Sequence, residues 1–91
     1  MKWMEIIKLR SAEQASEPLT AVLTAIVKDA PCGLIAARIY RHALWETDWS
    51  LHIHWDSAKP DKNGSLLGLR LSHAFEEFGL VDHSIWIEES E

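Results

Sequence analysis

The feature that most constrains the fold is the strict alternation of apolar and polar residues between Trp49 and Asp56. The apolar members are Trp49, Leu51, Ile53 and Trp55, and the polar members are Ser50, His52, His54 and Asp56. Successive side chains of a strand point to opposite faces of a sheet, so this segment predicts a strand with one buried and one open face. A chain of 91 residues forms one domain. The rest of residues 1–91 must therefore pack against that buried face.

Five further segments show the periodicity of strands or helices. Strands are predicted over Trp3–Arg10, Leu34–His42 and Val81–Glu88, and helices over Ser11–Ala30 and Ser65–Phe78. The first helix has two possible starts, a capping box formed by Ser11 and Gln14, and Ser16 ahead of Pro18. Its apolar stripe is Leu19, Val22, Leu23, Ile26, Val27 and Ala30. The stripe of the second helix is Leu67, Leu71, Ala74, Phe75 and Phe78, with Gly79 as a left-handed cap.

The order of these segments is strand, helix, strand, strand, helix, strand. Right-handed crossovers place both helices on the same face of one sheet. This order predicts an α+β domain of the ferredoxin-like type, with a four-stranded antiparallel sheet. Residues 43–48 form the hairpin connection, and Ser57–Gly64 reads as a loop.

The two faces of the predicted sheet differ in chemistry. Matching apolar with apolar residues puts Ile35, Ala37 and Ile39 under the helices, and places Arg38, Tyr40 and His42 on the open face beside the polar members of Trp49–Asp56. Trp86 also falls on the open face, because it alternates with Ile85 and Ile87. An open face with this much aromatic surface favours a partner. We therefore expect a two-fold dimer in which two sheets pack face to face.

Composition excludes several functional classes. The net charge is −5, and the nine Lys and Arg residues are scattered, which argues against binding to nucleic acid or to an anionic membrane. No apolar run is long enough to span a membrane, and Met1–Glu5 does not resemble a signal peptide. The lone Cys32 cannot form an internal disulfide, so a cytoplasmic location is expected and the thiol is read as incidental.

The side chains that could catalyse a reaction or bind a ligand lie on the open face. His52 and His54 share this face and are the candidate catalytic pair, since a histidine can remove a phenolic proton near neutral pH. His52 and His54 could instead coordinate a metal, with Asp56 or His42 as a third ligand, or they could be polar residues of an interface. The candidate ligand-binding residues are Arg38, Tyr40, His42, Trp55 and Trp86. Arg38 would hold a carboxylate or phenolate, and the aromatic rings would form walls for a flat ligand. No cofactor motif is present.

Three short segments carry a family resemblance: Ser65-Leu66-Leu67-Gly68 with Leu71, then Phe78-Gly79-Leu80-Val81, and Trp86. On these residues the chain resembles the antibiotic biosynthesis monooxygenase-like family of the dimeric α/β-barrel superfamily. The resemblance implies a homodimer whose two sheets form a barrel. It also implies binding of a small aromatic molecule, in some members with oxidation by O₂ without a cofactor, for which an Asn, a Trp and a His lie near the ligand. Asn63 is the only asparagine in this chain. The alternative hypotheses are a ligand-sensing module and a structural or interaction module without catalysis.

Overall fold

The computed structural model describes residues 1–11, 16–28, 31–58, 60 and 62–89. Its elements follow the predicted order. They are β1 (Lys2–Ser11), α1 (Ser16–Lys28), β2 (Leu34–Arg41), β3 (Asp48–Asp56), α2 (Leu66–Phe75) and β4 (Gly79–Ile87). The four strands form one antiparallel sheet in the order β2-β3-β1-β4, which is the order of a ferredoxin-like fold.

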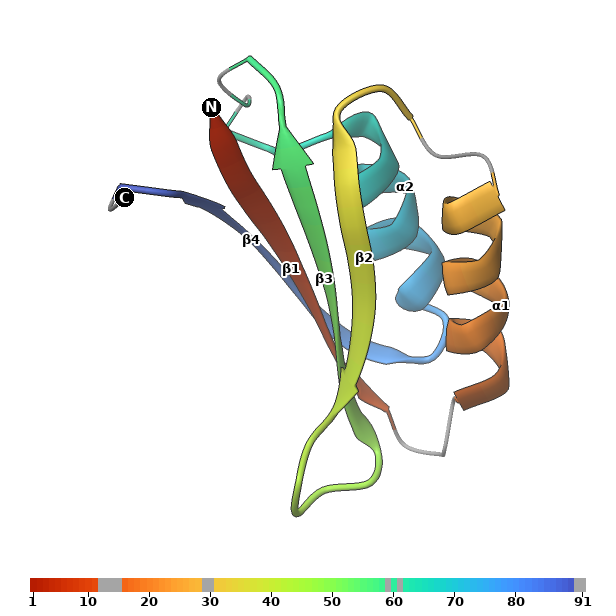
Figure 1. Ribbon diagram of the computed structural model, residues 1–91. Helices are drawn as coiled ribbons and strands as arrows, with labels where there is room; N and C mark the ends of the chain where they lie inside the picture. Colours follow the sequence, from red (N-terminus) through yellow and green to blue (C-terminus); the bar gives the residue numbers. More distant parts are fainter. Residues whose placement is uncertain (12–15, 29–30, 59, 61, 90–91) are drawn as a thin grey trace.

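Both helices lie against the same face of the sheet, and the other face is bare (Figure 1). The start of β1 and the end of β4 lie at the same end of the sheet, and the β2–β3 hairpin extends beyond the other end (Figure 1). The helix-side face carries the core, because alternate residues of each strand point toward α1 and α2. The buried core residues are Trp3, Ile7, Leu9, Ile26, Leu51, Ile53, Trp55, Leu71 and Phe75. The predicted division of the sheet into a covered and an open face is therefore confirmed.

Two details of the prediction for the first half of the chain are wrong, and two others lie outside the described residues. Ser11 belongs to β1, where its N–H donates to the carbonyl of Thr47, so α1 begins at the alternative start, Ser16. Ile35 is exposed at an irregularity in the β2–β3 pairing, and Leu34 takes the place opposite Trp55. The second capping-box residue, Gln14, and the stripe residue Ala30 lie outside the described residues.

The second helix ends earlier than its stripe predicted. Glu76 caps α2, and both Ala74 and Phe78 are exposed. Gly79 is the first residue of β4 and does not adopt a left-handed conformation. A side chain there would collide with the backbone of Arg10, so this glycine permits the close approach of β4 to the end of β1. In the part of the chain that the structure describes, neither helix has the length and apolar character needed to cross a membrane.

Candidate functional site

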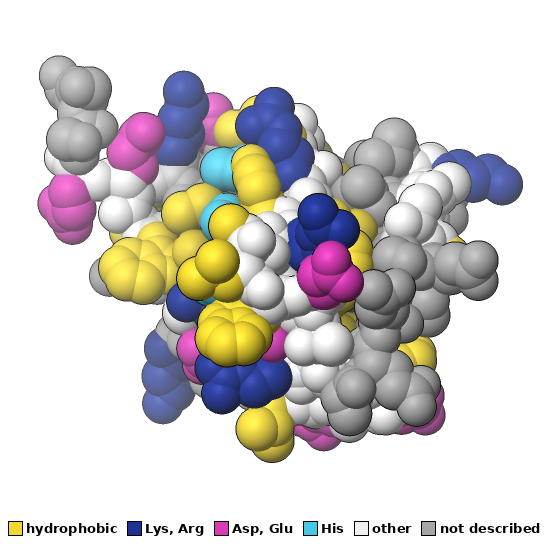
Figure 2. Space-filling view, turned by 90° about the horizontal axis from the view of Figure 1, so that it is seen from below, with side chains coloured by type: hydrophobic (Ala, Val, Ile, Leu, Met, Phe, Trp, Pro, Cys, Tyr) yellow, Lys and Arg dark blue, Asp and Glu magenta, His cyan; other side chains and the backbone are white. Residues whose placement is uncertain are grey.

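The open face is built of four rows of side chains that run across the strands. From the chain-terminus end to the hairpin end, the rows are Ala36–His54–Met4–Trp86, Arg38–His52–Ile6–Ser84, Tyr40–Ser50–Lys8–Asp82, and Asp48–Arg10–Leu80. Three large hydrophobic residues of these rows are well exposed: Tyr40 at 46%, Trp86 at 57% and Leu80 at 74%. Seen from the hairpin end, hydrophobic side chains are intermixed with histidine, Lys and Arg (Figure 2). The face is therefore neither a plain solvated surface nor a uniform apolar patch.

The first depression lies at the end of the sheet where β1 begins and β4 ends, and we call it the terminus-end pocket. It has a volume of about 470 Å³, and Met4, Arg38, His54 and Trp86 line it from four different strands. Trp55, which was predicted to bind a ligand, reaches this pocket only at its edge. Its side chain lies on the covered face, where it is 5% exposed and stacks on Trp3 with ring centroids 5.5 Å apart. The exposed aromatic wall of the pocket is therefore Trp86.

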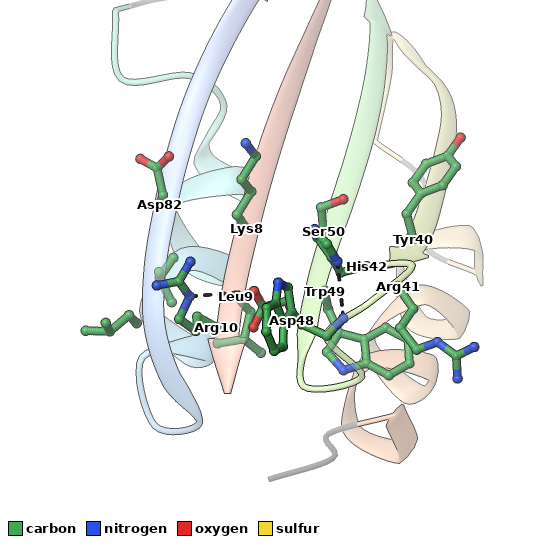
Figure 3. Close-up of a pocket in the computed structure, with 13 residues that line it drawn as sticks. Lys8, Leu9, Arg10, Tyr40, Arg41, His42, Asp48, Trp49, Ser50 and Asp82 are labelled. Carbon is green, nitrogen blue, oxygen red and sulfur yellow. Dashed lines mark hydrogen bonds and ion pairs between the residues drawn. The ribbon is translucent and has the colours of Figure 1, made fainter. Parts of the chain in front are cut away.

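The second depression lies beside the β2–β3 hairpin, and we call it the hairpin-end pocket. Its volume is about 500 Å³. Tyr40, Ser50 and Lys8 line it from neighbouring strands, with Asp82 on β4 beyond them (Figure 3). Arg10 is paired with Asp48 at 3.6 Å. The pocket thus combines aromatic, hydroxyl and charged groups, and it contains two of the predicted ligand-binding residues, Tyr40 and His42.

His42 has a fixed role at the rim of the hairpin-end pocket. Its Nδ1 accepts hydrogen bonds from the backbone N–H groups of Leu44, at 3.0 Å, and Trp45, at 3.2 Å. Because Nδ1 accepts, the neutral ring carries its proton on Nε2. His42 therefore closes the hairpin turn with one nitrogen and can offer only a donor to a ligand with the other.

His52 lies between the two pockets. Its Nε2 is 3.0 Å from the hydroxyl oxygen of Ser50, and its ring packs on that of Tyr40 with centroids 4.5 Å apart. Burial lowers the pKa of His52, and the positive charges of His54 and Lys8 lower it further. The imidazole is consequently neutral at neutral pH. The sequence placed His52 on this face but gave no sign of its bond to Ser50, because that bond depends on side-chain rotamers.

The metal alternative for His52 and His54 has no ligand set to support it. Among the residues that the structure describes, no three His, Cys, Asp or Glu side chains lie together as a metal site would require. Asp56, one proposed third ligand, instead accepts a hydrogen bond at 3.3 Å from the amino group of Met1. His42, the other, is used in the hairpin turn.

A polar cluster that the sequence analysis missed lies under the helices. Glu5 is fully buried, yet its carboxylate has four partners. Oε2 accepts from the indole N–H of Trp55 at 2.8 Å and from the hydroxyl of Ser65 at 2.6 Å. Oε1 accepts from the backbone N–H of Ser65 at 2.8 Å and lies 3.0 Å from Nε2 of His83. The same Ser65 hydroxyl caps α2 by accepting from the N–H of Gly68. The sequence contains one signal of this cluster: Glu5 is an acidic residue at a position of β1 whose side chain points toward the helices.

This cluster is structural because it leaves no room for a ligand. A Cβ atom on Gly64 or on Gly68 would collide with the carboxylate of Glu5. Both carboxylate oxygens are already satisfied by two partners each. Two of the residues that carry the family resemblance, Ser65 and Gly68, thus act in packing α2 onto the sheet.

Comparison with known proteins supports the fold. No family model matches the chain. No curated protein matches its sequence. Among solved structures, the chain is similar to Rv0793 from Mycobacterium tuberculosis, with a TM-score of 0.69 and 20% sequence identity over 100% of this chain and 98% of that one. At this identity the similarity shows a shared α+β fold that extends over the full length of both chains.

Proposed function

We propose that the chain binds a small planar aromatic anion in the terminus-end pocket and works as a homodimer whose open faces pack together. The observation that carries the proposal is the exposed indole of Trp86 at a pocket that Arg38 and His54 also line. An indole face stacks on a flat ring, and a guanidinium pairs with a carboxylate or phenolate in two parallel hydrogen bonds. Met4 adds an adaptable apolar surface beside the ring.

The charge around this pocket favours an anion. Arg38 faces His52 across the β2–β3 pair, and among the described residues no carboxylate lies within ion-pair distance of its guanidinium. Glu88, directly after β4, is the only acidic residue that lines the pocket among the described residues. A ligand carboxylate beside Arg38 would therefore complete an ion pair that the described residues do not supply.

Binding rather than oxidation is the activity that these residues support. The resembled oxygenases place an Asn, a Trp and a His near the ligand. Trp86 and His54 line one pocket, but Asn63 lies in the loop before α2 and lines neither pocket of the open face. His54 is the residue placed to accept a phenolic proton if the bound molecule carries one.

The test is calorimetric titration with 2-naphthoate, and with its neutral methyl ester for comparison. We expect naphthoate to bind, and Arg38→Met to weaken its binding about tenfold without affecting the ester, since a charge-assisted hydrogen bond contributes about 1.5–3 kcal/mol. Trp86→Leu should weaken both ligands. Trp45→Leu is the matched control, because this exposed tryptophan lines the other pocket.

Equal binding of naphthoate to the wild type and to Trp86→Leu would place the ligand elsewhere and defeat the proposal. Absence of any binding would favour a structural or interaction module. An oxygen electrode with 1,4-naphthoquinol then separates a binder from an oxygenase. Oxygen uptake above the spontaneous rate, lowered by Trp86→Leu, would add the oxidation step to the function.

A further inference from the structure

Ser50 and His52 form a hydroxyl–imidazole pair on the open face. They are two residues apart on β3, so both side chains point away from the helices. The hydroxyl oxygen of Ser50 lies 3.0 Å from Nε2 of His52, which is the distance expected between a nucleophile and its general base. The ring of Tyr40 packs on the imidazole at 4.5 Å with the planes inclined by 55°. Tyr40 therefore limits rotation of the base and holds Nε2 toward Ser50.

His52 has the protonation state that a base needs. Its surroundings are predominantly positive: Arg38 lies opposite it on β2, Lys8 is on β1, and His54 follows on its own strand. The carboxylates of this face lie toward its two ends or on the far strand: Asp48 at the hairpin end, Asp56 at the terminus end and Asp82 on β4. Burial and these positive neighbours hold the pKa of His52 below its usual value of 6.5. In the neutral tautomer that carries its proton on Nδ1, Nε2 accepts a hydrogen bond from the Ser50 O–H.

Lys8 lies directly across from Ser50 in the β1–β3 pair. Side chains so placed have Cβ atoms about 4.5–5.5 Å apart. The lysine side chain is long enough to bring its ammonium group near the carbonyl oxygen of an ester that the Ser50 oxygen attacks. A negative oxygen that develops there would meet a positive charge. The hairpin-end pocket, about 500 Å³, opens at this point and offers Trp45 and Leu80 as apolar walls. The pocket can accommodate a small ester with an aromatic or short aliphatic leaving group.

We propose that Ser50 is the nucleophile of an acyl-transfer site, with His52 as its general base and Lys8 as the stabiliser of the oxyanion. The Ser50 oxygen attacks the carbonyl carbon of an ester while its proton passes to Nε2 of His52. The tetrahedral intermediate collapses, the bond from carbon to the leaving oxygen breaks, and His52 returns the proton to that oxygen. Water then attacks the carbonyl carbon of the acyl-serine while His52 takes a proton from it, the bond from that carbon to the Ser50 oxygen breaks, and His52 returns the proton to this oxygen. The products are a carboxylic acid and free Ser50. This activity requires neither the dimer nor the aromatic anion proposed above, and it does require that any pairing of the open faces leaves the hairpin-end pocket accessible.

The test uses p-nitrophenyl acetate with the full chain. We expect rapid release of p-nitrophenolate and, by peptide mass mapping, an acetyl group on Ser50. Ser50→Ala should remove that acetyl group, and His52→Gln should slow its formation about 100-fold, the usual contribution of a general base. Ser84→Ala is the matched control, because Ser84 lies on the same face and its hydroxyl accepts from the indole N–H of Trp86 at 2.9 Å, and this variant should react like the wild type.

Two readouts separate a catalytic pair from a hydrogen bond that only orders the surface. The rate of Ser50 acetylation should rise with pH and reach half its maximum below pH 6.5, because the neutral imidazole is the active form. Diisopropyl fluorophosphate should modify Ser50 in the wild-type chain, a measurement that needs no variant. Acetyl groups found only on lysines or on the N-terminus, or wild-type rates in His52→Gln, would overturn the proposal.

Discussion

Glu5 joins four segments of the chain through one side chain. Its carboxylate, on β1, accepts from Trp55 on β3 and from Ser65 at the start of α2, and it contacts His83 on β4. Burying a carboxylate is costly unless hydrogen bonds replace its water. Here the hydrogen bonds are complete, so the cost appears only when one member is removed.

Replacement of Glu5 by Ala should therefore lower the free energy of unfolding by about 3–5 kcal/mol, because it leaves buried donors of three residues without an acceptor. Glu5→Gln should also destabilise the fold, since its amide N–H₂ would face groups that are themselves donors. Denaturant unfolding followed by tryptophan fluorescence measures both changes. Glu77→Gln, at an exposed position, is the control and should change stability by less than about 0.5 kcal/mol. A Glu5→Ala variant as stable as this control would show that the cluster does not hold the elements together.

Single residues show where sequence reasoning succeeds and where it stops. Alternation placed Arg38, His52 and Trp86 on the open face, because the direction of a strand side chain depends only on its position in the strand. The partners of Glu5 could not be predicted, because they come from positions 55, 65 and 83, which only the folded chain brings together. The same holds for the pair formed by Ser50 and His52.

Among the elements, the hairpin between β2 and β3 is held by two backbone hydrogen bonds, from His42 to Asp48 and from Asp48 to Trp45, and by one side chain. His42 accepts two backbone hydrogen bonds through Nδ1, an arrangement that Asn and Asp form more often in turns. His42→Ala should destabilise the chain by about 0.5–1.5 kcal/mol and speed amide hydrogen exchange at Leu44 and Trp45. His42→Asp should restore slow exchange, because a carboxylate can accept the same two bonds. Unchanged exchange in His42→Ala would mean that the turn forms without this side chain.

The order and the approximate ends of the elements followed from periodicity, but their irregular points did not. The displacement of Ile35 arises in the pairing of β2 with β3, which the polarity of β2 alone does not determine. Gly79 follows the second helix, where a glycine commonly forms the C-terminal cap. The structure instead requires a glycine there because β4 approaches the backbone of β1 too closely for a side chain. Local rules thus failed where contacts between distant segments decide the conformation.

At the scale of the whole molecule, the isolated chain has a larger accessible surface than is expected for a monomeric protein of its mass. Its accessible surface is 6390 Å². A monomeric protein of 10.4 kDa is expected to expose about 5,400 Å², from the scaling of surface with mass. The excess of roughly 1,000 Å² is close to the 800 Å² that each partner buries in a standard interface. The open face, which neither helix covers, is where this excess would be buried (Figure 1).

If the open faces pair, light scattering on a size-exclusion column should give a mass about twice 10.4 kDa. Leu80→Lys should then raise the dissociation constant about 100-fold, because it would bury a charge in the interface, whereas Leu66→Lys should leave the dimer intact. Both leucines are strongly exposed in the isolated chain, but Leu66 is on α2, away from the open face. A monomer at every concentration would contradict face-to-face pairing and leave Trp86 and Leu80 exposed to solvent. A dimer that Leu66→Lys breaks and Leu80→Lys does not would move the interface to the helices, and the ligand site would then have to be sought on a face that stays open.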